Sequence, residues 1–170
     1  MPLTKGETLG VWMNLLQVNQ VIQNALEQRL EESADLSLAE FEVLARLSSA
    51  PERRLKMIDI ANLLLVSKSG ITRIVDRLEQ AGLVKREVPP ENRRIVYTRM
   101  LPVGLEVFGH AQTIFKDAVE DTFSQHLSDG DVQALREVLH KLLVGHRVWE
   151  EERCTFKLDA TRMTASPSSA

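Results

Sequence analysis

Helical periodicity runs through most of this chain and gives way most clearly between Leu83 and Met100. Two runs rich in β-branched residues, Leu83–Val88 and Arg94–Met100, flank the turn-type sequence Pro89–Arg93, and this arrangement predicts a β-hairpin. Elsewhere apolar residues recur every three or four positions, which is the spacing of amphipathic helices. The pattern therefore predicts a mainly helical domain that carries one small hairpin.

Local signals predict where the helices begin and end. A serine three residues before an acidic residue has the capping-box spacing, a proline suits the first turn of a helix, and a glycine or proline ends one. These signals are the capping-box serines Ser37 and Ser128, the plausible N-cap Ser67 without an acidic residue three positions on, the first-turn proline Pro102, and the breakers Pro51 and Gly82. With the apolar periodicity they predict helices over about residues 9–30, 38–47, 58–65, 67–81, 102–123 and 128–143, with a short extended piece at 54–57.

Composition favours one soluble domain, since 170 residues with 44% hydrophobic and 26% charged residues match an ordinary globular protein. No apolar run approaches the roughly 18 residues of a membrane span, and the N-terminus lacks a secretory signal, so we expect a cytoplasmic protein without a membrane partner. Cys154 is the only cysteine, which excludes an internal disulfide and a cysteine-rich zinc module.

The charge is distributed unevenly along the chain. Residues 52–99 hold eleven basic and six acidic residues, a net charge of +5, which leaves −8 on the remainder. Such asymmetry is expected when one face of a protein binds a polyanion. The alternative is an ordinary solvated surface.

Three short helices followed by a hairpin form the pattern of a winged helix-turn-helix, and its third helix, residues 67–81, has the features of a DNA-reading helix. Its apolar residues lie on one side, and its opposite side is basic and polar, which suits the major groove of duplex DNA. The residues expected to contact DNA are Ser67, Lys68, Ser69, Thr72, Arg73, Arg77, Arg93 and Arg94.

The expected roles of these residues follow their positions. Ser67 and Ser69, with the free amides at the start of the helix, are candidates to hold a phosphate. Lys68, Thr72 and Arg73 are candidates for base edges. Each of them also has the simpler interpretation of an exposed polar residue.

Other cations are expected at the sugar-phosphate backbone or in the minor groove. Arg77 lies one turn further along the helix and is expected to face a flanking phosphate. Arg93 and Arg94, at the edge of the hairpin turn, are placed to enter the minor groove, whose negative potential attracts arginine. Lys85 and Arg86 are weaker phosphate candidates, because successive strand residues point to opposite faces.

The sequence resembles the MarR family of winged-helix transcription regulators in four segments: Ser37–Leu44, Met57–Ala61, Ser67–Arg86 and Asn92–Tyr97. The resemblance implies a dimer built from the terminal helices, a groove-reading helix at Ser67–Ala81, a wing arginine at Arg94, and repression relieved by a small molecule or a redox signal. The family usually has aspartate two residues before the wing arginine, where this chain has Asn92.

The terminal helices independently suggest a homodimer, because their apolar arcs are wider than packing on one small domain requires. We expect dimerisation segments at 1–35 and 102–160, a DNA-binding module at 36–101, and a disordered tail at 161–170. A twofold dimer predicts a pseudopalindromic site in double-stranded DNA, with half-sites about 10 base pairs apart. The alternative is a monomer whose helices are fully buried.

No nucleotide-binding loop or other catalytic motif is present, so the sequence supports neither catalysis nor a cofactor. No two histidines have the spacing that would place them on one helical face, so it does not support a metal site either. Large apolar residues on predicted inner helix faces form a candidate effector pocket, although the favoured explanation is that they are simply core: Trp12, Met13, Leu16, Phe41 and Met57. The function predicted is a dimeric, sequence-specific transcriptional repressor relieved by a small-molecule effector. The alternatives are an effector-independent architectural DNA binder and a helical adaptor for proteins.

Overall fold

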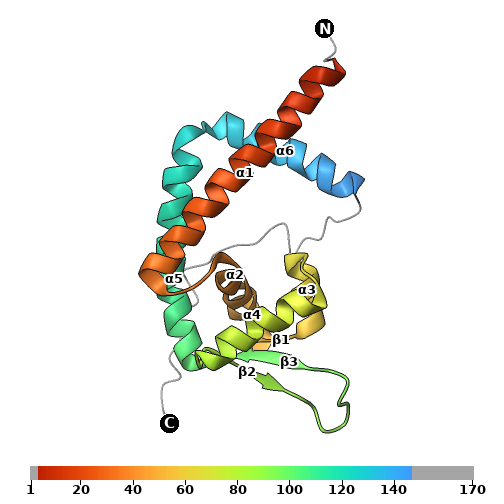
Figure 1. The fold of residues 1–170 in the computed structure, drawn as a ribbon, viewed down its shortest axis with the longest axis vertical. Coiled ribbons are helices and arrows are strands. Elements are labelled where there is room, and N and C mark those ends of the chain that lie inside the picture. Colours follow the sequence, from red (N-terminus) through yellow and green to blue (C-terminus); the bar gives the residue numbers. More distant parts are fainter. Residues whose placement is uncertain (1–3, 147–170) are drawn as a thin grey trace.

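The computed structural model describes residues 4–146, which form six α-helices and one small antiparallel sheet (Figure 1). Helices α1 (Lys5–Ala34) and α5 (Pro102–Thr122) pack together, and α6 (Asp129–Gly145) follows them in the upper part of the view. Helices α2 (Leu38–Ser49), α3 (Met57–Leu64) and α4 (Lys68–Gln80) gather with the sheet in the lower part. The mainly helical winged-helix architecture is confirmed.

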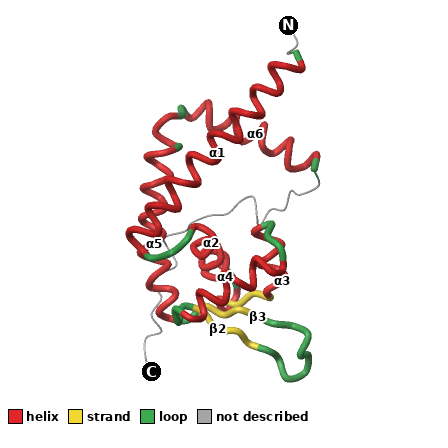
Figure 2. Tube along the Cα trace, viewed as in Figure 1, coloured by secondary structure: helices red, strands yellow, loops and turns green. Residues whose placement is uncertain are grey.

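The sheet has three strands, β1 (Arg54–Lys56), β2 (Val84–Glu87) and β3 (Tyr97–Met100), in the order β1-β3-β2 (Figure 2). The predicted hairpin is confirmed as β2–β3, but residues 94–96 belong to its connecting loop and not to a strand. The short piece at 54–57 was not predicted to pair. It adds β1 to the outer edge of β3, a long-range pairing that periodicity cannot reveal.

The helix ends follow the local signals. Ser37 and Ser128 cap α2 and α6 with complete capping boxes, Ser67 caps α4, and Pro102 occupies the first turn of α5. Helix α1 begins four residues earlier than predicted, because Thr4 and Glu7 form a capping box that the periodicity did not reveal. Two short 3₁₀ turns, Pro51–Arg53 and Ser124–His126, complete the described elements.

The core lies where α2 meets α4, α5 and the sheet. Phe41 of α2 is 1% exposed, and its ring stacks on Phe108 and Phe115 of α5 with centroid distances of 5.6 and 4.5 Å. From α4 the predicted apolar stripe enters the same core through Ile71, Val75 and Leu78. This packing fixes α4 with its opposite, polar side toward solvent.

Apolar side chains remain exposed on the terminal helices. The N-terminal two-thirds of α1 and much of α6 leave large hydrophobic residues uncovered: Leu9, Val11, Trp12, Met13, Leu15, Leu16, Val18, Val21, Val132, Val138, Leu139, Leu142 and Val144. A single chain therefore does not bury its terminal helices fully, as the alternative of a monomer requires. Among the described residues no helix is both long and apolar enough to cross a bilayer. The tail predicted at 161–170 and Cys154 lie outside the described residues.

Candidate nucleic-acid interface

The outward side of α4 carries the short polar and basic residues that the sequence singled out. Lys68, Ser69, Thr72 and Arg73 are all exposed, and so is the N-cap Ser67. They share one side because the buried stripe occupies the other. The structure therefore brings these five predicted residues together at the start of α4.

Hydroxyl groups order the beginning of α4. The Ser67 hydroxyl oxygen accepts a hydrogen bond from the Gly70 amide at 3.0 Å and lies 3.0 Å from the Ser69 hydroxyl oxygen. The Thr72 hydroxyl donates to the Lys68 carbonyl at 2.8 Å. These bonds hold short side chains against the helix, so the first turn of α4 can approach an anion closely.

Ion pairing divides the eleven cations of residues 52–99 into two groups. Five are bound to carboxylates of the chain: Arg54, Arg77, Lys85, Arg86 and Arg99. Six have no carboxylate partner anywhere in residues 4–146: Arg53, Lys56, Lys68, Arg73, Arg93 and Arg94. A polyanion can therefore bind members of the second group without breaking an internal ion pair, and four of them, Lys68, Arg73, Arg93 and Arg94, were predicted site residues.

Arg86 belongs to the paired group and ties β2 to α4. Its guanidinium lies 2.7 Å from the Asp76 carboxylate and 2.6 Å from that of Glu79, and it also donates to the Thr72 carbonyl at 3.1 Å. Lys85, next to it, pairs with Glu87 at 3.0 Å. The structure thus engages both weaker phosphate candidates within the protein, and Arg86 holds β2 against α4.

Arg77 is not the free surface cation that the sequence suggested. Its Nε lies 3.0 Å from Oε1 of Glu40 on α2, and its side chain nevertheless remains 66% exposed. The Glu40 side chain, in contrast, is only 6% exposed. Arg77 therefore anchors α4 to α2, and its outer edge still faces solvent.

The wing residues Arg93 and Arg94 are exposed in the loop between β2 and β3. The Asn92 side-chain oxygen accepts a hydrogen bond from the backbone amide of Arg94 at 3.1 Å. Asn92 therefore orders the backbone of the turn and leaves the Arg94 guanidinium free of a carboxylate within the described chain.

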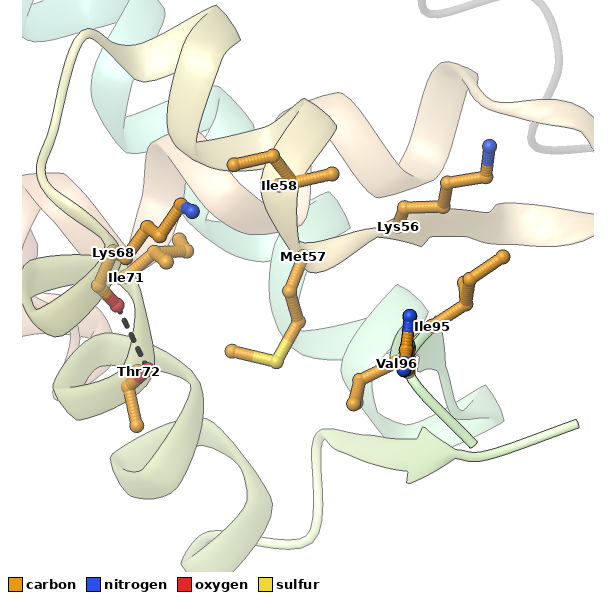
Figure 3. Close-up of a pocket in the computed structure, with 9 residues that line it drawn as sticks. Lys56, Met57, Ile58, Lys68, Ile71, Thr72, Ile95 and Val96 are labelled. Carbon is orange, nitrogen blue, oxygen red and sulfur yellow. Dashed lines mark hydrogen bonds between the residues drawn. The ribbon is translucent and has the colours of Figure 1, made fainter. Parts of the chain in front are cut away.

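A cleft of about 430 Å³ separates the start of α4 from the base of the wing (Figure 3). Its lining comes from β1, α3, α4 and the wing: Lys56, Met57, Ile58, Lys68, Ile71, Thr72, Arg94, Ile95 and Val96. Lys56 was missed by sequence reasoning, because only the β1–β3 pairing carries it to this place. The feature of the sequence that could have pointed to Lys56 is its position at the end of an extended piece directly before α3.

The structure separates the five residues proposed as an effector pocket. Trp12, Met13 and Leu16 are exposed on α1, Phe41 is sealed inside the core, and Met57 lines the cleft beside α4. Phe41 is core, as the alternative interpretation held. Within one chain these residues do not share a cavity, since their elements project them to different environments.

Comparison with known proteins agrees with this geometry. A model of the MarR family matches residues 36–96. The HTH-type transcriptional regulator MhqR of Bacillus subtilis is 30% identical over 109 residues, which cover 63% of this chain and 72% of that protein. The chain belongs to the MarR family.

Further relatives and solved structures agree in sequence and fold. The HTH-type transcriptional repressor IacR of Pseudomonas putida is 29% identical over 112 residues, and the match spans 66% of this chain and 65% of that protein. The MarR-family regulator Sco3205 of Streptomyces coelicolor, solved in complex with DNA, has a TM-score of 0.78 and 26% identity over 85% of this chain and 90% of its own. AbsC from the same organism has the same TM-score and 28% identity over 88% and 99%. The protein is therefore a MarR-family transcriptional regulator and not an enzyme.

Proposed function

We propose that this MarR-family protein is a homodimeric, sequence-specific repressor that binds duplex DNA through α4 and the wing and is released by a small-molecule effector. One observation carries the DNA-binding part. The cations without carboxylate partners in residues 4–146 include Lys68 and Arg73 on α4 and Arg93 and Arg94 on the wing. Unpaired cations on a groove-sized helix and its adjacent loop are suited to phosphates and base edges.

The residue roles follow from this arrangement. Lys68, Thr72 and Arg73 read base edges, and the hydroxyls of Ser67 and Ser69 contact a phosphate with the first amides of α4. Arg93 and Arg94 enter the minor groove. The exposed edge of Arg77 contacts a flanking phosphate while its other edge remains bound to Glu40. The affinity for DNA and the position of α4 on α2 therefore depend on the same side chain.

The homodimer is supported by the exposed apolar faces of α1 and α6. Eight large hydrophobic residues of α1 are exposed between Leu9 and Val21, a density that single soluble chains rarely leave uncovered. In this proposal residues 1–35 and 102–160 form the dimer and residues 36–101 form the DNA-binding module. A twofold axis then presents two α4 helices about one DNA turn apart.

Repression and its release are supported by relatives and by general thermodynamics. The relative IacR is named a transcriptional repressor. In this chain an effector would act by binding better to dimers whose two α4 helices do not match the operator spacing, because only differential affinity shifts a conformational equilibrium. Trp12, Met13 and Leu16 remain candidates to contact such an effector only where a second chain covers α1.

The experiment that tests this proposal is selection of random DNA duplexes by the purified full-length protein. We expect a twofold motif with half-sites about 10 base pairs apart, and an affinity that falls steeply as salt rises. A loose composition bias would identify an architectural DNA binder instead. Recovery of no DNA would overturn the proposal in favour of a protein adaptor.

A further inference from the structure

The cleft between α4 and the wing lies where a DNA strand must pass if α4 and the wing occupy adjacent grooves. The major and minor grooves of a duplex are separated by one sugar-phosphate strand. A helix in the first groove and a loop in the second therefore hold that strand between them. The space between the start of α4 and the base of the wing is this cleft of about 430 Å³.

Three cations line the cleft, one from each of three elements. Lys56 ends β1, Lys68 begins α4, and Arg94 lies in the wing. None of the three has a carboxylate partner in residues 4–146, whereas Arg54 and Arg99 on the same sheet are paired with Glu87. Positive charge without an internal partner is thus concentrated around one hollow.

The rest of the lining is mostly apolar: Met57, Ile58, Ile71, Ile95 and Val96. In Figure 3 Met57 lies between Lys56 and Lys68, with Ile95 and Val96 beside Lys56. Charged walls with an apolar floor match the alternation of phosphate and sugar along a DNA strand, because phosphates attract the cations and sugars present apolar carbon.

Lys56 is held in place by the sheet. It stands opposite Tyr97 in the β1–β3 register, and the amide of the next residue, Met57, donates to the Val96 carbonyl at 2.9 Å. The backbone of Lys56 is therefore fixed relative to the wing base, and only its flexible side chain needs to be ordered on binding.

We propose that this cleft binds the sugar-phosphate strand between the two grooves and that Lys56 contacts one of its phosphates. The inference rests on the proposed DNA-binding function and adds a strand path and a contact residue to it. Lys56, Lys68 and Arg94 then form a clamp in which β1 is part of the DNA-binding surface. Lys56 contributes affinity and no base preference, because phosphates carry no sequence information.

The test compares Lys56→Gln with Arg53→Gln on the operator recovered by duplex selection. Arg53 is a matched control, since it is exposed, lacks a carboxylate partner in the described chain, and does not line the cleft. Log affinity falls linearly with log salt, and loss of one phosphate contact should make this negative slope about 0.9 less steep. Affinity near 0.1 M salt should fall about five- to tenfold in Lys56→Gln. The Arg53→Gln slope should equal that of the wild type.

A second measurement locates the contact on the DNA. Single methylphosphonate substitutions remove the charge of one phosphate at a time, and one of them should weaken the wild type while leaving Lys56→Gln unaffected. If wild type binds the operator and Lys56→Gln keeps the full slope, the strand-clamp inference is overturned and the proposed function stands. If wild type shows no salt-dependent DNA binding, the proposed function itself fails.

Discussion

Arg77 and Glu40 join the DNA-reading helix to the helix beneath it: Nε of Arg77 lies 3.0 Å from Oε1 of Glu40, and a second guanidinium nitrogen donates to Oε2 at 3.2 Å. The same carboxylate accepts hydrogen bonds from the amide and hydroxyl of Ser37, the N-cap of α2, at 2.8 and 2.7 Å. One nearly buried carboxylate therefore caps α2 and positions α4.

Replacement of Arg77 should cost stability as well as DNA affinity. We expect Arg77→Ala to lower the free energy of unfolding by about 1–2 kcal/mol, because it leaves the Glu40 carboxylate with fewer donors while solvent screens the exposed partner. Urea unfolding measures this difference. Arg73→Ala, one turn earlier and without an ion pair in the described chain, should change stability by less than about 0.5 kcal/mol. Equal stability of the two variants would contradict the anchoring role.

Arg73 and Arg77 should also differ in how they affect DNA binding. Arg73→Ala is expected to cost about 1–3 kcal/mol of binding free energy and to relax preference at one base of each half-site. Arg77→Ala should weaken all sequences alike and reduce the salt slope by about 1. Binding titrations on the operator and its single-base variants separate these effects. Indistinguishable profiles would show that the two roles are wrongly assigned.

A charge on the apolar face of α1 should dissociate the dimer. Val18 is 52% exposed in the single chain, and Val18→Glu would place a carboxylate in the proposed interface, where burial of a charge is costly. Sedimentation equilibrium should show monomers at concentrations where wild type is dimeric. Gln17→Glu, which adds the same charge beside it on a polar residue, is the control. A dimeric Val18→Glu protein would place the interface elsewhere.

Gly104, in the first turn of α5, should not tolerate a side chain. A Cβ at this position would overlap the Leu83 carbonyl, which already accepts a hydrogen bond from the Leu101 amide at 2.9 Å. We expect Gly104→Ala to destabilise the protein by about 1–3 kcal/mol, because backbone must move to make room. Val103→Ala, at an exposed neighbour, should change the melting temperature little. Similar melting temperatures would refute the close approach.

Glu87 should make the sheet sensitive to acid. Its carboxylate contacts Lys85, Arg99 and Arg54, so it links all three strands. Hydrogen bonds from Lys85 and then Arg99 hold the pKa of Glu87 below its usual value. The stabilisation is therefore complete above the usual pKa and is lost as pH falls through the lowered one. Thermal melts against pH should show a smaller acid loss in Glu87→Gln, and an unchanged loss would exclude this carboxylate as a cause.

Local features of the sequence predicted most of the secondary structure. A capping serine, a first-turn proline and a glycine at a helix end act within a few residues, and Gly82 indeed has the positive φ of 71° that such an end requires. The spacing of Ile71, Val75 and Leu78 predicted both the buried side of α4 and the exposed position of Lys68, Thr72 and Arg73. Those candidate site residues could be predicted from the sequence, because helix periodicity alone decides which side of α4 they occupy.

The partners of the cations could not be predicted in the same way. Glu40 and Arg77 are 37 residues apart, and Arg99 meets the Glu52 side chain across 47 residues. Which arginine is engaged and which is available depends on contacts that exist only after the chain has folded. The environments of the effector candidates show the same limit, since Phe41 and Met57 can each be apolar on a helix and still face different surroundings in the folded chain.

The sequence by itself determined the order of helices, their ends and the polar side of α4, because caps and periodicity are short-range interactions. Only the tertiary structure decided that β1 joins the hairpin, that Gly104 touches Leu83, and that Lys56 faces the same cleft as Lys68 and Arg94. Each of these depends on two segments meeting in space, and no local propensity encodes the distance between them.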